Sequence, residues 1–270
     1  MTHTSNETVE PTTARLARLR AYPVKGFDGI DLETATVLPG GTLEHDREFA
    51  LFDADGDVFN AKRSDRFHRL STAYDPETVT FRVETPDGRT REFPLGSDEG
   101  RERAASWFGE YFDADLTVRR DRSTGFVDRR DMGPSVVSTA TLEAMASWFD
   151  GLTVGSVRRR LRANVEVSGV PAFWEDRLVG DDAPVLVVGD VRLEGTTPCG
   201  RCVVPSRDPD TGDPLPEFRE RFVEKRRETF PDWADADAFD HFYTSMVIAS
   251  VPEPDRGSTL AVDEPVRLGA

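Results

Sequence analysis

The chain has 270 residues, of which 37% are apolar, and a formal net charge of −16 at pH 7. Its length suits one large domain or two small ones, and its apolar content is sufficient for a buried core. A surface this acidic repels nucleic acids and anionic membranes, so we expect neither as a partner. Lysine supplies only three of the 34 basic residues. Acidic, lysine-poor surfaces suit concentrated salt, which screens their self-repulsion, and we therefore expect a halophilic source.

The start of the chain gives no sign of a targeting segment. Residues 1–15 are polar, and no window of the sequence approaches the ~18 apolar residues that a membrane-spanning helix needs. We therefore expect a cytoplasmic protein. Thiols are normally kept reduced in the cytoplasm, which argues against a structural disulfide between Cys199 and Cys202.

Short runs of alternating apolar residues recur along the chain, with the period of two that a half-buried strand needs. These runs cover residues 30–38, 79–83, 116–118, 165–167 and 185–193. Pairs of residues that favour tight hairpin turns lie between such runs, at Asp55-Gly56, Asp87-Gly88 and Gly189-Asp190. The sequence therefore predicts a mainly β protein of the α+β class.

Helical spacing of apolar residues occurs in only three places, at residues 104–112, 142–149 and 215–228. We therefore predict few helices beside a large amount of sheet. The polar stretch 119–131 follows the first predicted helix. It is the best candidate for a boundary between two β-rich units.

Both cysteines of the chain lie within one short segment, Cys199-Gly200-Arg201-Cys202. A zinc site would need a second pair of ligands, and the four histidines are scattered along the sequence. A thioredoxin-type pair should lie between a strand and a helix, whereas Cys202 leads directly into Val203-Val204-Pro205. Two interpretations stay open on spacing alone, namely two packed apolar thiols or a thiolate that binds a soft metal.

Other short motifs accompany the cysteines in a characteristic order. They are Tyr22-Pro23-Val24-Lys25-Gly26, Asp46-Arg47-Glu48-Phe49, Arg162-Ala163-Asn164, Pro198-Cys199-Gly200-Arg201-Cys202 and Asp208-Pro209-Asp210-Thr211-Gly212. Together they resemble the signature of the MOSC family of molybdenum cofactor-binding domains, within it the amidoxime-reducing component and its bacterial relatives. The resemblance extends from about residue 15 to residue 268. It implies an N-terminal β-barrel-like domain, residues 15–120, followed by a β-barrel MOSC domain with a few helices, residues 121–270.

The resemblance also implies a site. Cys202 matches the thiolate that binds molybdenum, which is reasonable because a soft sulfur suits such a metal, whereas Cys199 matches a position without a metal role. Basic side chains suit the phosphate of the pterin, and those at matching positions are Lys25, Arg47, Arg162 and Arg201. Asn164 follows Arg162 by two residues, so we expect both on one face of a strand.

The turn that follows the cysteines is a second candidate part of the site. Pro209 fixes one backbone angle and Gly212 supplies a permissive closing position, so the segment predicts a turn. Such a turn beside Cys202 would bring Asp208, as a catalytic group, or Thr211 towards the other ligands of the metal.

The implied function is that of a molybdenum cofactor-dependent oxidoreductase, with tungsten as an alternative metal, which reduces N-hydroxylated or N-oxide small molecules. The chain has neither an iron–sulfur cysteine cluster nor a dinucleotide fingerprint. Electrons would therefore come from a separate ferredoxin, flavoprotein or cytochrome-like protein. Two other functions stay open, namely a sulfur carrier or transferase that forms a persulfide on Cys202, and a cofactor-binding or delivery module without turnover.

Overall fold

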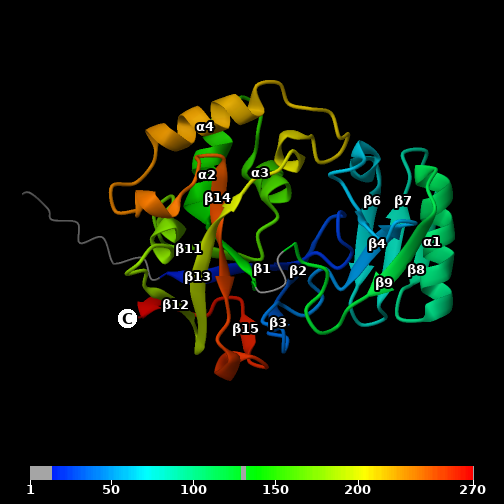
Figure 1. Ribbon diagram of the computed structural model, residues 1–270, viewed down its shortest axis with the longest axis horizontal. Coiled ribbons are helices and arrows are strands. Elements are labelled where there is room, and N and C mark those ends of the chain that lie inside the picture. Colours follow the sequence, from blue (N-terminus) through cyan, green and yellow to red (C-terminus); the bar gives the residue numbers. More distant parts are fainter. Residues whose placement is uncertain (1–13, 129–131, 270) are drawn as a thin grey trace, which may run out of the picture.

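The computed structural model describes residues 14–128 and 132–269. Most of the polar leading segment and the last part of the proposed boundary, residues 129–131, lie outside the described residues. Within the described ranges the chain forms sixteen strands and four α-helices, which confirms the prediction of a mainly β protein. Figure 1 shows two lobes, a larger one built around a long sheet and a smaller one that carries α1 on its outer side.

The larger lobe contains an eight-stranded sheet in the order β16-β12-β13-β14-β10-β11-β1-β2. Two of these strands come from the start of the chain, because β1 pairs with β11 on one side and with β2 on the other. All neighbours run antiparallel except β10 and β11, which are parallel. The strands are β1 (Arg15–Ala21), β2 (Ile30–Leu32), β10 (Ser135–Ser138), β11 (Val165–Ser168), β12 (Val185–Val188), β13 (Val191–Gly200), β14 (Thr244–Ser250) and β16 (Val266–Gly269). A short separate pair joins β3 (Thr34–Thr36) to β15 (Thr259–Ala261).

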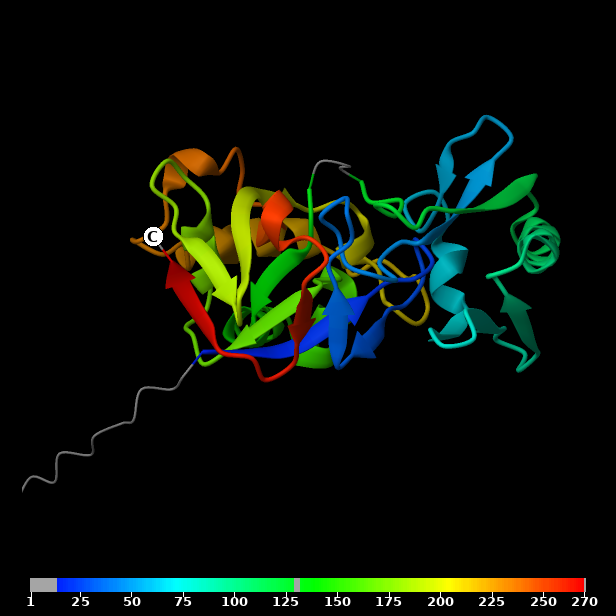
Figure 2. The same cartoon turned by 90° about the horizontal axis from the view of Figure 1, so that it is seen from below.

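The smaller lobe contains two three-stranded sheets, in the orders β5-β4-β9 and β6-β7-β8. Its elements are β4 (Phe49–Asp53), β5 (Val58–Phe59), the 3₁₀ helix η1 (Asp65–Arg69), β6 (Ser71–Asp75), β7 (Thr80–Glu84), β8 (Thr90–Pro94), α1 (Asp98–Phe112) and β9 (Leu116–Arg120). Its core is rich in buried aromatic rings, among them Phe67, Phe81 and Phe108. In both views the short cyan helix η1 lies between α1 and the larger lobe (Figures 1 and 2).

The predicted hairpin turns are confirmed. Gly56, Gly88 and Gly189 all have positive φ angles and lie between β4 and β5, β7 and β8, and β12 and β13, respectively. The last hairpin leads directly into the long strand β13, which carries Cys199 close to its end. The turn at Gly189 therefore sets the register of the strand that delivers the cysteine motif.

The helices agree only partly with the sequence. The three predicted segments are confirmed as α1, α2 (Thr139–Ser147) and α4 (Phe218–Glu228). The prediction of few helices is confirmed, but the sequence showed no helical spacing for α3 (Val154–Leu161), at whose start the Thr153 side chain accepts from the Ser156 amide. None of the helices in the described ranges has the length and apolar character needed to cross a bilayer.

Candidate functional site

A cavity of about 310 Å³ lies where the two lobes meet. Its wall combines segments that are far apart in the sequence, namely the loop after β1, the region around η1, the end of α3 and the end of β13. The cavity contains six of the eight predicted site residues, which are Lys25, Arg47, Arg162, Asn164, Arg201 and Cys202. The fold therefore brings together side chains that the sequence separates by more than 170 residues.

The wall of this cavity is strongly basic although the whole chain carries a net charge of −16. Eight of its side chains are cationic, namely Lys25, Arg47, Lys62, Arg159, Arg160, Arg162, Arg201 and Arg207. Only three carboxylates lie among the described lining residues, Asp28, Asp46 and Asp128. Such an excess of cations in a concave site favours an anionic ligand.

Two of the predicted arginines lie against one aromatic ring. The guanidinium carbons of Arg162 and Arg47 lie 4.1 Å and 4.8 Å from the centroid of Tyr22. The Arg47 guanidinium also pairs with Asp46, whereas Arg162 pairs with no described carboxylate. Burial lowers the pKa of Arg162 to about 10, the attraction of Tyr22 opposes this shift, and the charge of Arg47 adds to it. Arg162 is therefore a half-buried cation without a counter-ion among the described residues.

The predicted geometry of Arg162 and Asn164 is wrong. Arg162 ends α3 in the left-handed conformation, with a φ of 63°, and β11 begins only at Val165, so the two residues do not share a strand face. The Asn164 side chain accepts from the amide and the hydroxyl of Ser135, both at 3.1 Å, and donates to the Arg20 carbonyl at 3.0 Å. Asn164 therefore fixes the backbone of the cavity wall.

The two cysteines differ in their surroundings. Both are free and half-buried, but the Cys199 thiol accepts from the Arg201 guanidinium at 3.1 Å, whereas the Cys202 thiol has no partner among the described residues. The Cys202 carbonyl accepts from the Tyr243 hydroxyl at 3.2 Å, which holds its backbone in place. Cys202 is therefore the thiol that is available to a ligand in the cavity.

One hydrogen-bond donor of the Arg201 side chain has no acceptor among the described residues. One terminal nitrogen contacts Cys199, the other donates to the Leu161 carbonyl at 2.9 Å, and the buried Nε has no partner among the described residues. A buried donor without a partner costs free energy. Arg201, which lines the cavity, therefore keeps one donor for which the described residues supply no acceptor.

Lys62 and Asp128 belong to the site although sequence reasoning missed both. Asp128 lies 2.6 Å from the Lys25 ammonium and 2.9 Å from the Lys62 ammonium. Burial lowers the pKa of Lys25, against the opposing charge of Asp128. The pKa of Lys62 is raised, because Asp128 and then Cys202 together outweigh the effect of burial. The scarcity of lysine was a usable signal, since two of the three lysines line this cavity.

His68 is a further lining residue that the sequence did not single out. Its Nε2 atom is buried and has no partner within the part of the chain that the structure describes. Burial lowers the pKa of His68, and the charges of Arg207 and Arg162 lower it further. His68 is therefore neutral at pH 7 and can donate or accept one hydrogen bond in the cavity.

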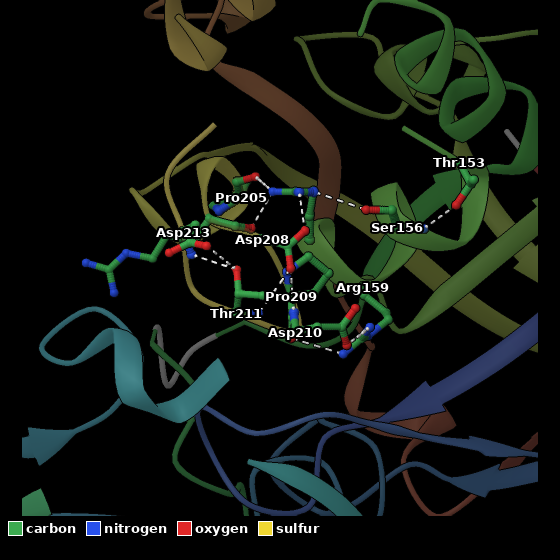
Figure 3. A network of polar contacts seen from close by, with 11 residues as sticks. Thr153, Ser156, Arg159, Pro205, Asp208, Pro209, Asp210, Thr211 and Asp213 are labelled. Atoms are coloured by element: carbon green, nitrogen blue, oxygen red, sulfur yellow. Dashed lines mark hydrogen bonds and ion pairs between the residues drawn. The ribbon is translucent and has the colours of Figure 1, made fainter. Parts of the chain in front are cut away.

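The turn that follows the cysteines is confirmed, and Figure 3 shows the polar contacts within it. Asp208 accepts from the amides of Asp210 and Thr211 at 2.9 Å and 3.0 Å, and the Thr211 hydroxyl donates to Asp213 at 2.9 Å. Neither Asp208 nor Thr211 is among the described lining residues, although Pro209 is. These hydrogen bonds belong to the turn itself, but the Asp208 carboxylate also pairs with the cavity-lining Arg160 at 3.5 Å.

No group of three or more His, Cys, Asp or Glu side chains is placed to hold a metal ion within residues 14–128 and 132–269. A metal bound by Cys202 would therefore need most of its other ligands from a small molecule bound in the cavity. The basic wall and the single available thiol fit an anionic cofactor that brings its own metal ligands.

Comparisons with known proteins identify relatives of the chain and the domains that it contains. The human mitochondrial amidoxime-reducing component 1 is 24% identical to the chain, over 73% of the chain and 67% of that protein. The mitochondrial amidoxime reducing components 2 of human and Macaca fascicularis are both 27% identical, over 73% of the chain and 68% of each relative. The model of the MOSC N-terminal beta barrel domain matches residues 13–152, and that of the MOSC domain matches residues 132–239. The predicted resemblance and order of domains are confirmed, and the chain belongs to the MOSC domain family.

Proposed function

We propose that the protein is a molybdenum cofactor-dependent oxidoreductase that reduces N-hydroxylated or N-oxide substrates with electrons from a separate carrier protein. The observation that carries the proposal is the available Cys202 thiol in a cavity whose wall holds eight cationic side chains. The names of the relatives support the reaction type, since they are called amidoxime-reducing components.

The cavity fits the phosphate of a pterin cofactor. The buried Arg201 Nε lacks a partner among the described residues, and the nearby Arg162 has no counter-ion there, so a bound phosphate would satisfy both. We assign the cofactor's phosphate to Arg162, Arg201, Arg47 and Lys25, and its metal, molybdenum or tungsten, to the Cys202 sulfur. Asn164 contributes by holding the backbone between β1 and β10.

When bound, this cofactor supplies two-electron oxygen-atom chemistry. The residues of the chain would hold the cofactor and orient the substrate. Reduction of an N–OH group to N–H with loss of water consumes two protons. Both protons come from solvent, and the Lys25 ammonium, which Asp128 holds at 2.6 Å, keeps its charge for the phosphate. Lys62 lines the same cavity as Cys202 and adds a positive charge to its wall.

The test combines metal analysis with turnover. Molybdenum, tungsten, zinc and pterin are measured in protein purified from its native host, and benzamidoxime reduction is followed with reduced methyl viologen as the electron donor. We expect close to one molybdenum or tungsten per chain, together with turnover. Cys202→Ala should lose the metal and the activity, while Cys199→Ala, the matched control, should keep both.

The other outcomes separate the rival functions. Absence of both metal and pterin from the native protein would sink the proposal. A persulfide on Cys202 in such metal-free protein would favour a sulfur transferase. Metal and pterin without turnover of any N-hydroxylated compound would instead favour a cofactor delivery module.

A further inference from the structure

A second hollow, of about 440 Å³, lies on the surface of the smaller lobe between η1, α1 and the turn from β7 to β8. Its lining, which we call the arginine groove, consists of Arg66, Arg69, Thr85, Pro86, Asp87, Arg89, Arg91, Trp107, Glu110 and Tyr111. Four of these side chains are cationic and two are acidic. The groove is therefore positive on a protein whose net charge is −16.

Two of the four arginines in the groove are free to meet a partner. Arg69 pairs with Asp65 at 3.1 Å and Arg89 pairs with Asp87 at 2.7 Å. Arg66 and Arg91, by contrast, form no ion pair with any carboxylate in the described ranges. Charged groups that lack an internal partner are the ones that an oppositely charged surface can neutralise.

Two aromatic side chains form part of the lining of the arginine groove. The rings of Trp107 and Tyr111 are stacked, with centroids 5.5 Å apart and planes 5° apart. The Arg66 guanidinium lies 4.5 Å from the centroid of Tyr111, which orders its long side chain. Rigid aromatic residues and arginine are the side chains that protein interfaces favour.

The groove and the cavity share one structural element. Within η1, Arg66 and Arg69 line the groove, whereas Phe67 and His68 line the cavity. The rings between them are in contact, because Tyr111 lies 4.9 Å from Phe112 and Phe112 lies 4.5 Å from Phe67, centroid to centroid. A partner seated in the groove would thus be separated from the cavity by a single packed layer.

We propose that the arginine groove is the docking site of the electron carrier, and that this carrier is a protein with an acidic surface. The inference rests on the proposed function, which requires an external carrier. An acidic carrier is repelled by most of the surface of this chain, so a local positive groove would select one orientation. That orientation places the carrier against the wall that the cavity shares with η1.

The reaction balances with two electrons from the carrier. The N–O bond of the N-hydroxylated substrate breaks and an N–H bond forms. Of the two protons taken from solvent, one completes water on the leaving oxygen and the other goes to the nitrogen, which is reduced by the two electrons. The carrier is oxidised, by two electrons at once or by one electron in each of two encounters. The groove takes no part in the bond-breaking step, so its loss should affect only reduction by the protein carrier.

The experiment compares two electron donors in the cofactor-loaded protein. Benzamidoxime reduction is measured with reduced methyl viologen and with three reduced acidic carriers, namely a [2Fe–2S] ferredoxin, a flavodoxin and a cytochrome b5. The groove variant combines Arg66→Glu and Arg91→Glu. The matched control combines Arg82→Glu and Arg103→Glu, which makes the same charge change at two exposed arginines outside the groove.

We expect the groove variant to lower kcat/KM for the best protein carrier about 10-fold or more and to weaken its dependence on salt. The viologen-driven rate should stay within about twofold, and the control should keep both rates. The proposal would be overturned if the groove variant kept its carrier-driven rate, or if its rate fell equally with both donors. It would also be overturned if the control variant lost as much carrier-driven rate, or if viologen supported turnover but none of the acidic carriers did. Absence of viologen turnover in the unsubstituted protein would overturn the proposed function instead.

Discussion

The Arg162 guanidinium lies 4.1 Å above the ring of Tyr22, whose hydroxyl donates to the Ala163 carbonyl at 3.2 Å. This hydrogen bond fixes the Tyr22 ring to the backbone that follows α3, and the ring packs against the Arg162 guanidinium. Burial lowers the pKa of Arg162 to about 10, so the group stays charged at pH 7. An anion that enters the cavity would offset the cost of burying this charge.

Removal of Arg162 should weaken the binding of the cofactor. We expect Arg162→Ala to retain pterin with an affinity lower by about 10- to 100-fold, because a hydrogen bond between charged groups contributes about 1.5–3 kcal/mol. Pterin content after dialysis is the measurement. Arg119→Ala is the matched control, since Arg119 lies 4.2 Å over the ring of Phe52 and does not line the cavity. Equal retention in the two variants would contradict the assignment of Arg162.

The stability of the protein should fall between weakly acidic and neutral pH because of Glu175. This residue is fully buried, and burial, followed by the charge of Asp176, raises its pKa to about 7 from an ordinary value of 4.5. A carboxyl with a raised pKa stabilises the fold fully below about pH 4.5, and this contribution is lost as the pH rises through 7.

Glu175→Gln should remove this loss, because the amide keeps the oxygen that accepts from the Ser138 amide at 3.2 Å. We expect its free energy of unfolding to exceed that of the unsubstituted protein by about 1–3 kcal/mol at pH 8, and by much less at pH 5. Denaturant titrations at the two pH values test this. The exposed Glu194→Gln serves as the control, and parallel pH curves for all three proteins would refute the idea.

A methyl group at Gly133 should destabilise the protein. A Cβ atom there would lie 2.5 Å from the Gly41 carbonyl oxygen and 3.0 Å from that of Ala249, and both oxygens belong to backbone. We expect Gly133→Ala to lower the free energy of unfolding by about 1–3 kcal/mol. Gly155→Ala should instead be neutral or stabilise α3 by up to about 1 kcal/mol, since its Cβ meets only Thr153 at 3.7 Å. Similar stabilities of the two variants would argue against a close approach at Gly133.

Asp208 tests whether the turn beside the cavity contributes to catalysis. Asp208→Asn keeps an oxygen that can accept from the amides of Asp210 and Thr211. If the residue only forms the turn, this variant should keep its turnover rate within about threefold, while Asp208→Ala should lose about 1 kcal/mol of stability with the two hydrogen bonds. A turnover rate that drops by about two orders of magnitude in Asp208→Asn, with unchanged thermal stability, would restore the catalytic role that the sequence predicts.

Local sequence patterns predicted the hairpins and most helices, because the residues that determine these elements lie within a few positions of one another. Asp87-Gly88 suits a tight turn in any context, and Phe108 and Phe112 lie on one buried face of α1. Helix α3 was missed because its apolar residues Val157 and Leu161 are separated by three arginines. Its most visible signal was the capping residue Thr153, which accepts from the Ser156 amide at 3.1 Å.

The candidate site was predictable in its residue types and less so in its arrangement. Motif order identified Cys202 and the arginines, but only the fold shows that Lys62 and Asp128 join them. Arg162 illustrates the reason, because its left-handed conformation depends on where α3 ends and cannot be inferred from alternation along a strand. The inward position of His68 likewise depends on how η1 packs between the two lobes.

The pairing of β1 with β11 makes the two halves of the chain depend on each other. A fragment that began at residue 121 would expose the full edge of β11, with unpaired amides and carbonyls that recruit other strands. In the intact chain the last strand on this side is β2, which has only three residues and offers little to a neighbouring molecule. The opening segment therefore protects the sheet against self-association, as well as contributing Lys25 to the cavity.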